Sequence, residues 1–223
     1  MTRLPLSRRA GIGSSPSAND DAALEDAIGD VVGEAVRALA DGFVIGVPTD
    51  TVYGLAVDPG AAGSLERLRQ AKGRPETVAL PVLVARAEDA SDLAVLSGPA
   101  ERLIARYWPG PLTIVLARRP GVDFDLGGDS STIGVRCPDH GLLREILGRS
   151  GALAVTSANR HGSRPLELAA EVSAELGDAL ALVVDGGRCD REPSTVVSLA
   201  GPEPVVLRPG AVALDEAELR ALG

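Results

Sequence analysis

The sequence predicts an α/β fold, in which a twisted mixed sheet is flanked by helices. Short apolar runs rich in Val, Ile and Leu alternate with segments whose apolar residues recur every three or four positions, a pattern typical of strands alternating with helices. Proline punctuates the chain, and the runs 112–117 and 132–136 are expected to pair antiparallel. Polar side chains follow the first strong strand, which is where ligands bind in open α/β sheets.

Length and composition predict a single folded domain over residues 20–223. The chain has 223 residues, of which 45% are hydrophobic and only 2% aromatic. One sizeable core can therefore be built from Ala, Val, Leu and Ile. Residues 1–19 are rich in Ser, Gly, Pro and Arg and show no apolar period, so we expect a disordered tail there.

Charge and cysteine content argue against several classes of protein. The net charge of −9 argues against broad electrostatic binding to nucleic acid or to an anionic membrane. No run approaches the roughly 18 apolar residues of a membrane span. Cys137 and Cys189 lie far apart and form no C-x-x-C pair, which predicts neither a disulfide framework nor a zinc site. A cytoplasmic location is the simplest expectation.

The N-terminal half is expected to open with a helix and a buried strand. Leu24, Ile28, Val31, Ala35 and Leu39 recur at helical spacing. The apolar run 43–47 then predicts a strand that stops at Pro48. The elements expected next are a helix over 64–72 ended by Gly73, a strand-like run over 78–84 interrupted by Pro81 and a helix over 99–108.

The C-terminal half alternates in the same way. The Pro-, Gly- and Asp-rich stretch 118–131 is typical of a long surface loop. The expected strands are 112–117, 132–136, 152–156, 179–184, 195–199 and 205–207. The expected helices are 139–149, 166–176 and a short last one that Asp215-x-x-Glu218 would cap.

The stretch around which the chain is organised reads GFVIGVPTDTVYGL, at 42–55. Its strand stops at a proline, and Thr49, Asp50, Thr51 and Tyr53 follow at once. Two interpretations are open. Thr49 and Asp50 cap a turn and do no more, or the group binds a ligand where the strand ends. Gly54 lets the backbone bend or approach another segment closely.

Lys72-Gly73-Arg74-Pro75 places two cations at the end of a predicted helix. The helix dipole favours cations there, so they need no function. Alternatively, Gly73 breaks the helix and Arg74 is extended before Pro75, so both side chains turn toward one point. A Lys charge beside an Arg fork suits a polyphosphate. Neither common glycine-rich phosphate loop occurs, so a nucleotide would be held mainly by side chains.

Polar residues follow several later strands as well. Ser157 and Asn159 come after an apolar strand, where they form either an ordinary turn or part of a site. Arg136 ends a buried strand and requires an acid, which is either a substrate carboxylate or an internal Asp. Ser194 heads a strand and Arg208 ends one, and each is a weak signal by itself.

Metal-centred and nucleophilic chemistry are disfavoured. His140 and His161 are the only histidines and belong to no His/Cys cluster, so a metal site made of protein ligands is not predicted. Two scattered histidines make no nucleophilic triad, and no G-x-S-x-G occurs. Cys137 is expected to be a small buried apolar residue. The candidate functional groups that remain are cationic side chains and hydroxyls. Such groups promote a reaction by positioning substrates and stabilising charge.

Ordered motifs then relate the chain to a known family. The motifs are PTDTVYGL at 48–55, KGRP at 72–75, WPGPLT at 108–113, TIGVRCPDH at 132–140, TSAN at 156–159, STVV at 194–197 and LRPG at 207–210. Over residues 25–210 the chain resembles the YrdC/Sua5 family of threonylcarbamoyl-AMP synthases. The resemblance implies a YrdC-like domain with a concave active-site cavity.

The resemblance also implies substrates and partners. ATP with Mg²⁺, L-threonine and bicarbonate would yield threonylcarbamoyl-AMP and pyrophosphate. A downstream tRNA threonylcarbamoyl transferase would use that product for the t6A modification, so contact with tRNA would be indirect. No membrane partner is implied.

Individual residues receive roles from the same resemblance. Catalysis at the ATP phosphates is implied for Lys72, Arg74, Ser157 and Asn159. The nucleotide would be held by these four together with Thr132 and Arg208. L-threonine would be held by Thr51, Arg136, Ser194 and the backbone of Val155, and Tyr53 would line the cavity between the two substrates.

The chain departs from the family pattern in two places. Val78 and Leu83 stand where many relatives carry a polar residue and a histidine. Arg160-His161-Gly162 follows Asn159 where SAN-x-SG is usual. Longer members add a second domain, and this chain resembles the short, single-domain type.

Two other functions stay open at this stage. One is an RNA-binding YrdC-like module without adenylate-forming activity, which the acidic balance and the few aromatic residues disfavour. The other is a related carbamoyl-transfer domain, which normally belongs to a much larger chain.

Overall fold

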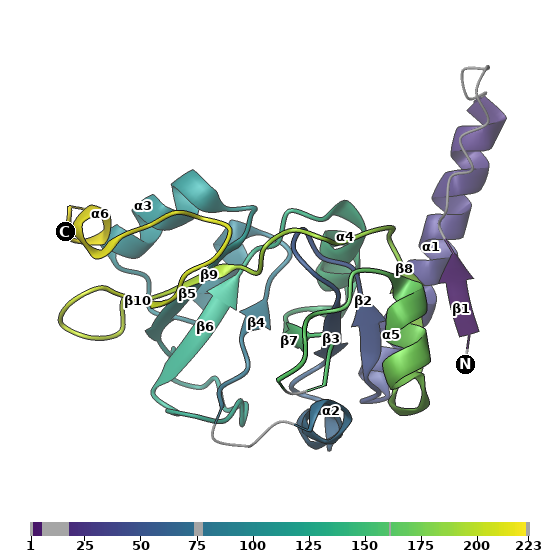
Figure 1. The fold of residues 1–223 in the computed structure, drawn as a ribbon, viewed down its shortest axis with the longest axis horizontal. Coiled ribbons are helices and arrows are strands. Elements are labelled where there is room, and N and C mark those ends of the chain that lie inside the picture. The colour runs from purple at the N-terminus through teal and green to yellow at the C-terminus, as the bar shows by residue number, and fades with distance from the viewer. Residues whose placement is uncertain (1, 6–17, 74–77, 161, 222–223) are drawn as a thin grey trace.

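The structure is a computed structural model that describes residues 2–5, 18–73, 78–160 and 162–221. Within these residues the chain forms a mixed sheet with the strand order β1-β8-β2-β3-β7-β4-β6-β5-β9-β10. Helices flank the twisted sheet, and α1 extends beyond its end (Figure 1). The predicted α/β fold class with a twisted mixed sheet is confirmed.

The strands are short, and the central ones are buried. Their bounds are β1 Thr2–Pro5, β2 Ile45–Val47, β3 Gly54–Val57, β4 Val82–Leu83, β5 Leu112–Ala117, β6 Thr132–Arg136, β7 Leu153–Ser157, β8 Leu182–Asp185, β9 Thr195–Ser198 and β10 Val205–Arg208. Strands β5 and β6 pair antiparallel, as the sequence predicted for 112–117 and 132–136. Strand β4 lies parallel to β6 but antiparallel to β7.

The helices begin and end at sequence signals. Their bounds are α1 Ala18–Ala40, α2 Ser64–Lys72, α3 Gly98–Tyr107, α4 Gly141–Ser150, α5 Ala169–Leu176 and α6 Glu216–Arg220. Gly73 ends α2 in the left-handed conformation, at φ 63°, where glycine carries no steric penalty. Asp215 and Glu218 form the predicted capping box of α6. None of the described helices is both long and apolar enough to span a membrane.

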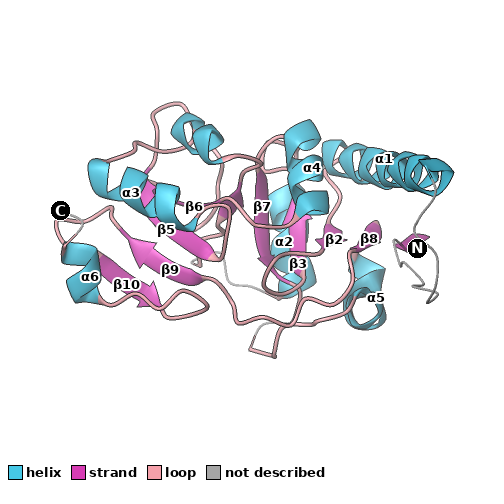
Figure 2. Ribbon diagram, turned by 90° about the horizontal axis from the view of Figure 1, so that it is seen from above, coloured by secondary structure: helices cyan, strands magenta, loops and turns pink. Residues whose placement is uncertain are grey.

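Two apolar clusters cover the two faces of the sheet. On one face α1 and α4 pack on β2, β3, β7 and β8 through residues such as Val32, Leu39, Ile146 and Val184. The larger cluster holds residues of α2, α3 and α5, among them Leu68, Leu103 and Val172. Figure 2 shows α1 and α4 together on one side of these strands and α5 on the other. This packing fixes the strands from which the polar residues project.

Several elements differ from expectation. Strand β3 follows the 48–53 turn at once and was not predicted, because its apolar part, 55–57, is only three residues long. Residues 78–84 were expected to form a strand-like run interrupted by Pro81, and the paired strand is only Val82–Leu83, directly after that proline. Residues 1–19 were expected to be a disordered tail, but Thr2–Pro5 pairs with β8 and α1 starts at Ala18. The backbone of β8 would otherwise lie at a sheet edge, where unpaired groups accept another strand. Residues 6–17 of that tail lie outside the described residues.

Candidate active site

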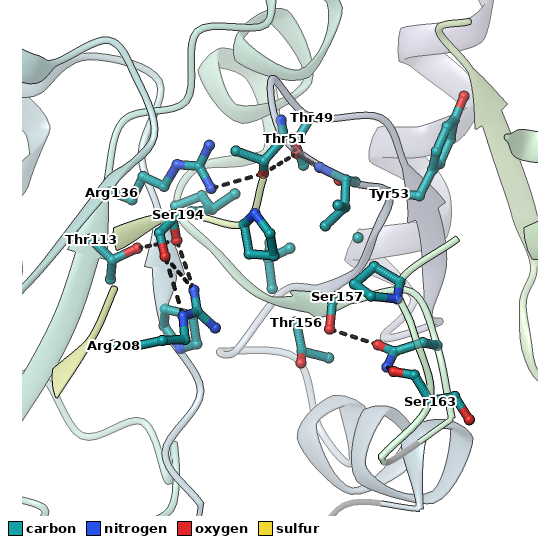
Figure 3. A pocket seen from close by; sticks show the side chains of 18 residues that line it. Thr49, Thr51, Tyr53, Thr113, Arg136, Thr156, Ser157, Ser163, Ser194 and Arg208 are labelled. Carbon is teal, nitrogen blue, oxygen red and sulfur yellow. Dashed lines mark hydrogen bonds between the residues drawn. The ribbon is translucent and has the colours of Figure 1, made fainter. Parts of the chain in front are cut away.

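Polar side chains converge on a cavity of about 320 Å³ (Figure 3). Arg136 ends β6 and Ser157 ends β7, but these two strands run in opposite directions because each pairs with β4 in the opposite sense. The cavity therefore lies across a face of the sheet, beneath the 48–53 turn, rather than at one end of it. Its floor includes Leu83, which stands opposite Arg136 in the sheet register.

Thr49 builds the turn that covers this cavity. Its hydroxyl accepts hydrogen bonds from the backbone N–H groups of Thr51, at 3.0 Å, and Val52, at 3.1 Å, and lies 2.6 Å from the Val52 carbonyl oxygen. The Thr51 hydroxyl lies 2.9 Å from that of Thr49 and lines the cavity. Thr49 thus caps the turn, and it also lines the cavity. Gly54 allows the next strand to approach β7, because a Cβ there would meet Val155 at 2.8 Å.

Tyr53 holds the turn to a distant segment. Its hydroxyl donates to the Gly187 carbonyl at 2.8 Å and accepts from the Gly186 N–H at 3.2 Å. Burial raises the pKa of this phenol well above its usual value, so it stays protonated and can donate. Tyr53 is among the lining residues, but its hydroxyl points away from the other labelled side chains (Figure 3). Tyr53 therefore shapes the wall of the cavity with its ring.

Arg136 lies buried at one end of the cavity, held by three acceptors. Its Nε donates to the Gly110 carbonyl at 3.0 Å, its Nη2 to Asp50 Oδ1 at 2.5 Å and its Nη1 to Thr51 Oγ1 at 3.4 Å. The side chains of Arg136 and Asp50 are 7% and 5% exposed. The acid that a buried arginine needs is thus present inside the protein. Because Arg136 also lines the cavity, a substrate carboxylate remains a second partner.

Arg208 reaches the same end of the cavity from β10. Its Nη2 donates to the carbonyl and the hydroxyl of Ser194, at 2.7 and 3.0 Å, and the Ser194 hydroxyl lies 3.1 Å from that of Thr113. Burial and, after it, the positive charge of Arg136 lower the pKa of Arg208. In the described part of the chain no carboxylate forms a salt bridge with Arg208. This end of the cavity is therefore suited to an anion.

Lys72 lies beside the opposite end of the cavity. Its ammonium donates to the carbonyl and the hydroxyl of Ser157, at 2.6 and 3.0 Å, and also to Asn159 Oδ1. The Ser157 hydroxyl donates to Asn159 Oδ1 at 2.7 Å, and Asn159 Nδ2 donates to the Ser163 carbonyl. The structure thus brings together Lys72, Ser157 and Asn159. Arg74 lies outside the described residues.

Of the predicted site residues not yet placed, some line the cavity and others do not. Val155 lines the cavity, whereas Thr132 does not. Thr132 begins β6 and Arg136 ends it, so the two are about 13 Å apart along the strand. Of the two family departures, Leu83 lines the cavity and Val78 is 40% exposed. His161 lies outside the described residues.

The role assignment from sequence missed several lining residues, among them the hydroxyl-bearing Thr113, Thr156 and Ser163. Thr113 lies in the WPGPLT motif, directly after a hard turn, and this position was its only signal. Ser163 contributes its carbonyl to Asn159, and a backbone contact leaves no mark in the sequence.

Comparison with known proteins places this geometry in a family. A family model described as "Telomere recombination", the Sua5/YciO/YrdC domain, matches residues 37–210. The chain belongs to the Sua5/YciO/YrdC family. The matched range contains every residue assigned to the candidate site above.

Relatives of this family come from distant organisms. A Mycobacterium tuberculosis protein is 38% identical over 184 residues, which are 81% of this chain and 84% of that protein. The Bacillus subtilis protein named threonylcarbamoyl-AMP synthase is 34% identical over 194 residues, which are 84% of this chain but 55% of that protein. The chain thus spans about half the length of the Bacillus relative.

Solved structures of the family share the fold. Pyrococcus abyssi Sua5, solved in complex with L-threonine, matches with a TM-score of 0.79 and 33% identity over 86% of this chain and 57% of that one. Escherichia coli YciO matches with a TM-score of 0.77 and 26% identity over 84% of this chain and 92% of that one. The Sua5/YciO/YrdC fold therefore accounts for most of the chain.

Proposed function

We propose that this chain is a threonylcarbamoyl-AMP synthase, which forms threonylcarbamoyl-AMP and pyrophosphate from L-threonine, bicarbonate and ATP. The single observation that carries the proposal is the polarity of one cavity. An ammonium with a serine and an asparagine stands at one end, and two guanidinium groups stand at the other. Relatives named threonylcarbamoyl-AMP synthase in Bacillus subtilis and Homo sapiens share 34% and 36% identity with the chain.

The two ends divide the substrates. Lys72, Ser157 and Asn159, with Arg74, would hold the ATP phosphates, because an ammonium and neutral donors match phosphate oxygens. The resemblance also implies nucleotide contacts for Arg208 and Thr132. These contacts would require the nucleotide to extend to the Arg136 end of the cavity, where Arg208 lies, and beyond the cavity lining, to which Thr132 does not belong. Thr51, Arg136, Ser194 and the Val155 backbone would hold L-threonine, with Tyr53 shaping the wall. The P. abyssi complex with L-threonine supports an amino acid site in this fold.

The proposed reaction needs positioning rather than a protein nucleophile. The amino group of L-threonine and bicarbonate form an N–C bond with loss of water, which gives a carbamate, and a carboxylate oxygen of this carbamate attacks the α-phosphorus of ATP. The bond from that phosphorus to the bridging oxygen breaks, and pyrophosphate leaves. Lys72 is placed to stabilise the charge that develops on the phosphates, and the Ser157–Asn159 contact holds the ammonium in place.

Magnesium enters this proposal with the nucleotide. In the described part of the chain no group of three or more His, Cys, Asp or Glu could hold a metal ion. Mg²⁺ usually keeps several waters and binds through substrate phosphates, which suits a cavity with no Asp or Glu among its described lining residues. When bound, the ion would neutralise phosphate charge.

The product dictates what must follow. A mixed carboxylic–phosphoric anhydride transfers its acyl group readily, so we place a tRNA threonylcarbamoyl transferase downstream, and tRNA contact is indirect. A cytoplasmic location agrees with this partner. The RNA-binding alternative is not favoured by the relatives, which are named as synthases.

Product identification tests the proposed function. The purified chain is incubated with ATP, Mg²⁺, L-threonine and ¹³C-bicarbonate, and nucleotides are separated and weighed by mass spectrometry. The proposal expects threonylcarbamoyl-AMP that carries one ¹³C atom. Unlabelled threonyl-AMP, or no new adenylate while a family synthase is active in parallel, would overturn it.

A further inference from the structure

Asp50 lies in the turn above the cavity but does not take part in forming the turn. Thr49 accepts the backbone N–H bonds that hold the turn, and Asp50 accepts none of them. In the part of the chain that the structure describes, Arg136 is the hydrogen-bonded partner of the Asp50 carboxylate, through Oδ1, and Oδ2 has none. The side chain is 5% exposed. A carboxylate buried in this way has a cost that only a charge contact offsets.

The contacts of Arg136 fix the plane of its guanidinium. This group has five N–H donors, and three of them are used by Gly110, Thr51 and Asp50. One N–H on each of Nη1 and Nη2 is left, in the fork that matches a carboxylate. Arg136 lines the cavity, so the remaining fork is available to a substrate there.

The charge balance of the cavity points the same way. Two guanidinium groups, Arg136 and Arg208, share one cavity of about 320 Å³. The charge of Arg136 contributes to lowering the pKa of Arg208, so the two cations oppose each other. Asp50 offsets one of them without entering the cavity, because it is absent from the lining residues.

We infer that Asp50 is a positioning residue for the amino acid substrate: it aims the Arg136 fork at the substrate carboxylate and compensates the arginine charge while the site is empty. This inference rests on the proposed function. Asp50 touches no substrate and acts only through Arg136.

The first test is Asp50→Asn, measured by steady-state pyrophosphate release with threonine varied. The asparagine keeps the acceptor oxygen and puts its amide nitrogen at the place of Oδ2, so the shape is preserved while the charge is lost. Hydrogen bonds to charged groups contribute enough that the threonine KM should rise about 10–100-fold, whereas kcat at saturating threonine and the Kd for ATP alone should change little. A residue that only stabilises the fold would lower the melting temperature and leave the threonine KM unchanged.

Asp190→Asn is the matched control. Asp190 is exposed and lines, together with Asp50, a second pocket of about 230 Å³ behind the turn. The Asp190→Asn substitution removes one negative charge from the pocket that Asp50 also lines, and it leaves the Asp50–Arg136 contact in place. An equal rise of the threonine KM in both variants would mean that the negative charge near the cavity matters, rather than the hydrogen bond between Asp50 and Arg136. That result would overturn the inference.

A double-mutant cycle decides whether Asp50 acts through Arg136. Threonine binding is measured for wild type, Asp50→Asn, Arg136→Gln and the double variant. The inference expects the double variant to bind threonine as Arg136→Gln does, since Asp50 has nothing left to aim. A further loss in the double variant would overturn it. That comparison does not need the single Asp50 variant, so it stands even where Asp50→Asn alone fails to fold.

The wild-type arm separates the two claims. Wild type without threonine-dependent pyrophosphate release would contradict the proposed function, whatever the variants do. Active wild type with an unchanged threonine KM in folded Asp50→Asn would contradict only the positioning role.

Discussion

The ammonium group of Lys72, on α2, donates hydrogen bonds to both the carbonyl and the hydroxyl of Ser157, 85 residues further along the chain. The helix dipole alone would leave a cation at a helix end exposed to solvent, but Lys72 is only 4% exposed. The contact joins the KGRP and TSAN motifs on one side of the cavity. The helix-end interpretation of Lys72 is therefore incomplete, and its place beside the cavity leads to the first prediction.

Replacement of Lys72 by Met should cut threonine-dependent pyrophosphate release about 10²–10³-fold, because one preorganised charge contact at a reacting centre is lost. The methionine keeps most of the side-chain volume. Initial rates at saturating ATP check the prediction, and circular dichroism checks the fold.

Gln70→Ala is the control for this variant. Gln70 is an exposed residue of the same helix, and its side-chain amide donates to Glu66 Oε1, away from the cavity lining. Wild-type rates are expected from it. If a well-folded Lys72→Met variant were equally active, the assignment of the phosphate site would be withdrawn.

Thr113→Val should weaken the amino acid end of the cavity modestly. The substitution preserves shape and removes the hydroxyl that lies 3.1 Å from Ser194 Oγ. A single neutral hydrogen bond contributes about 0.5–1.5 kcal/mol, so the threonine KM should rise about tenfold or less. Ser198→Ala, on the neighbouring β9, should leave the KM unchanged. An unaltered KM in Thr113→Val would show that Ser194 needs no support from β5.

Acidification should destabilise the protein through His140. Burial lowers the pKa of His140 below its ordinary value of 6.5, against the opposing influence of Asp50 and Asp139. The unfolded chain then binds a proton at higher pH than the folded chain, so stability falls as the pH drops through 6.5 and is lowest below the folded pKa.

His140→Asn isolates this effect. Asparagine is a good N-cap and can replace the imidazole nitrogen that accepts the Leu143 N–H at the start of α4. Melting temperatures at about pH 7.5 and about pH 5.5 are compared for both proteins. The acid-induced drop should be smaller in His140→Asn. Equal drops would assign the pH dependence to other groups.

Valine should be a far poorer substrate than serine. A site that hydrogen-bonds a hydroxyl rejects an isostere lacking it by up to about 10⁴-fold, whereas a missing methyl group costs about 10–200-fold. The amino acid end of the cavity contains the hydroxyls of Thr51, Thr113 and Ser194. Values of kcat/KM for the three amino acids check the order, and comparable values for valine and threonine would contradict a hydroxyl-selective pocket.

Elements with a strong local signal could be predicted from the sequence. Gly73 ends α2, and the antiparallel pair β5–β6 follows from two apolar runs and the proline-rich turn before them. Strand β3 was not predicted, because its apolar part has only three residues, 55–57, which is shorter than the run of four to eight that indicates a buried strand. Strand β4 is short because Pro81 removes a donor, and this interruption was visible in the sequence, although the end of the strand after Leu83 was not.

The candidate site was predictable to a similar degree. Lys72, Ser157 and Asn159 were grouped through ordered motifs, and the structure places them in mutual contact. The choice between a substrate and an internal acid for Arg136 could not be made, since Asp50 lies 86 residues away and only the folded sheet brings it near. Long-range pairs of this kind follow from topology and not from local pattern.

The most direct test of the central claim is the rate of pyrophosphate release from ATP by the purified chain, measured with both co-substrates and with each one omitted. Because the attacking group is a carbamate that contains both, pyrophosphate release should depend on L-threonine and on bicarbonate together. Release that continues without threonine or in bicarbonate-free buffer, or no release with both present, would contradict it.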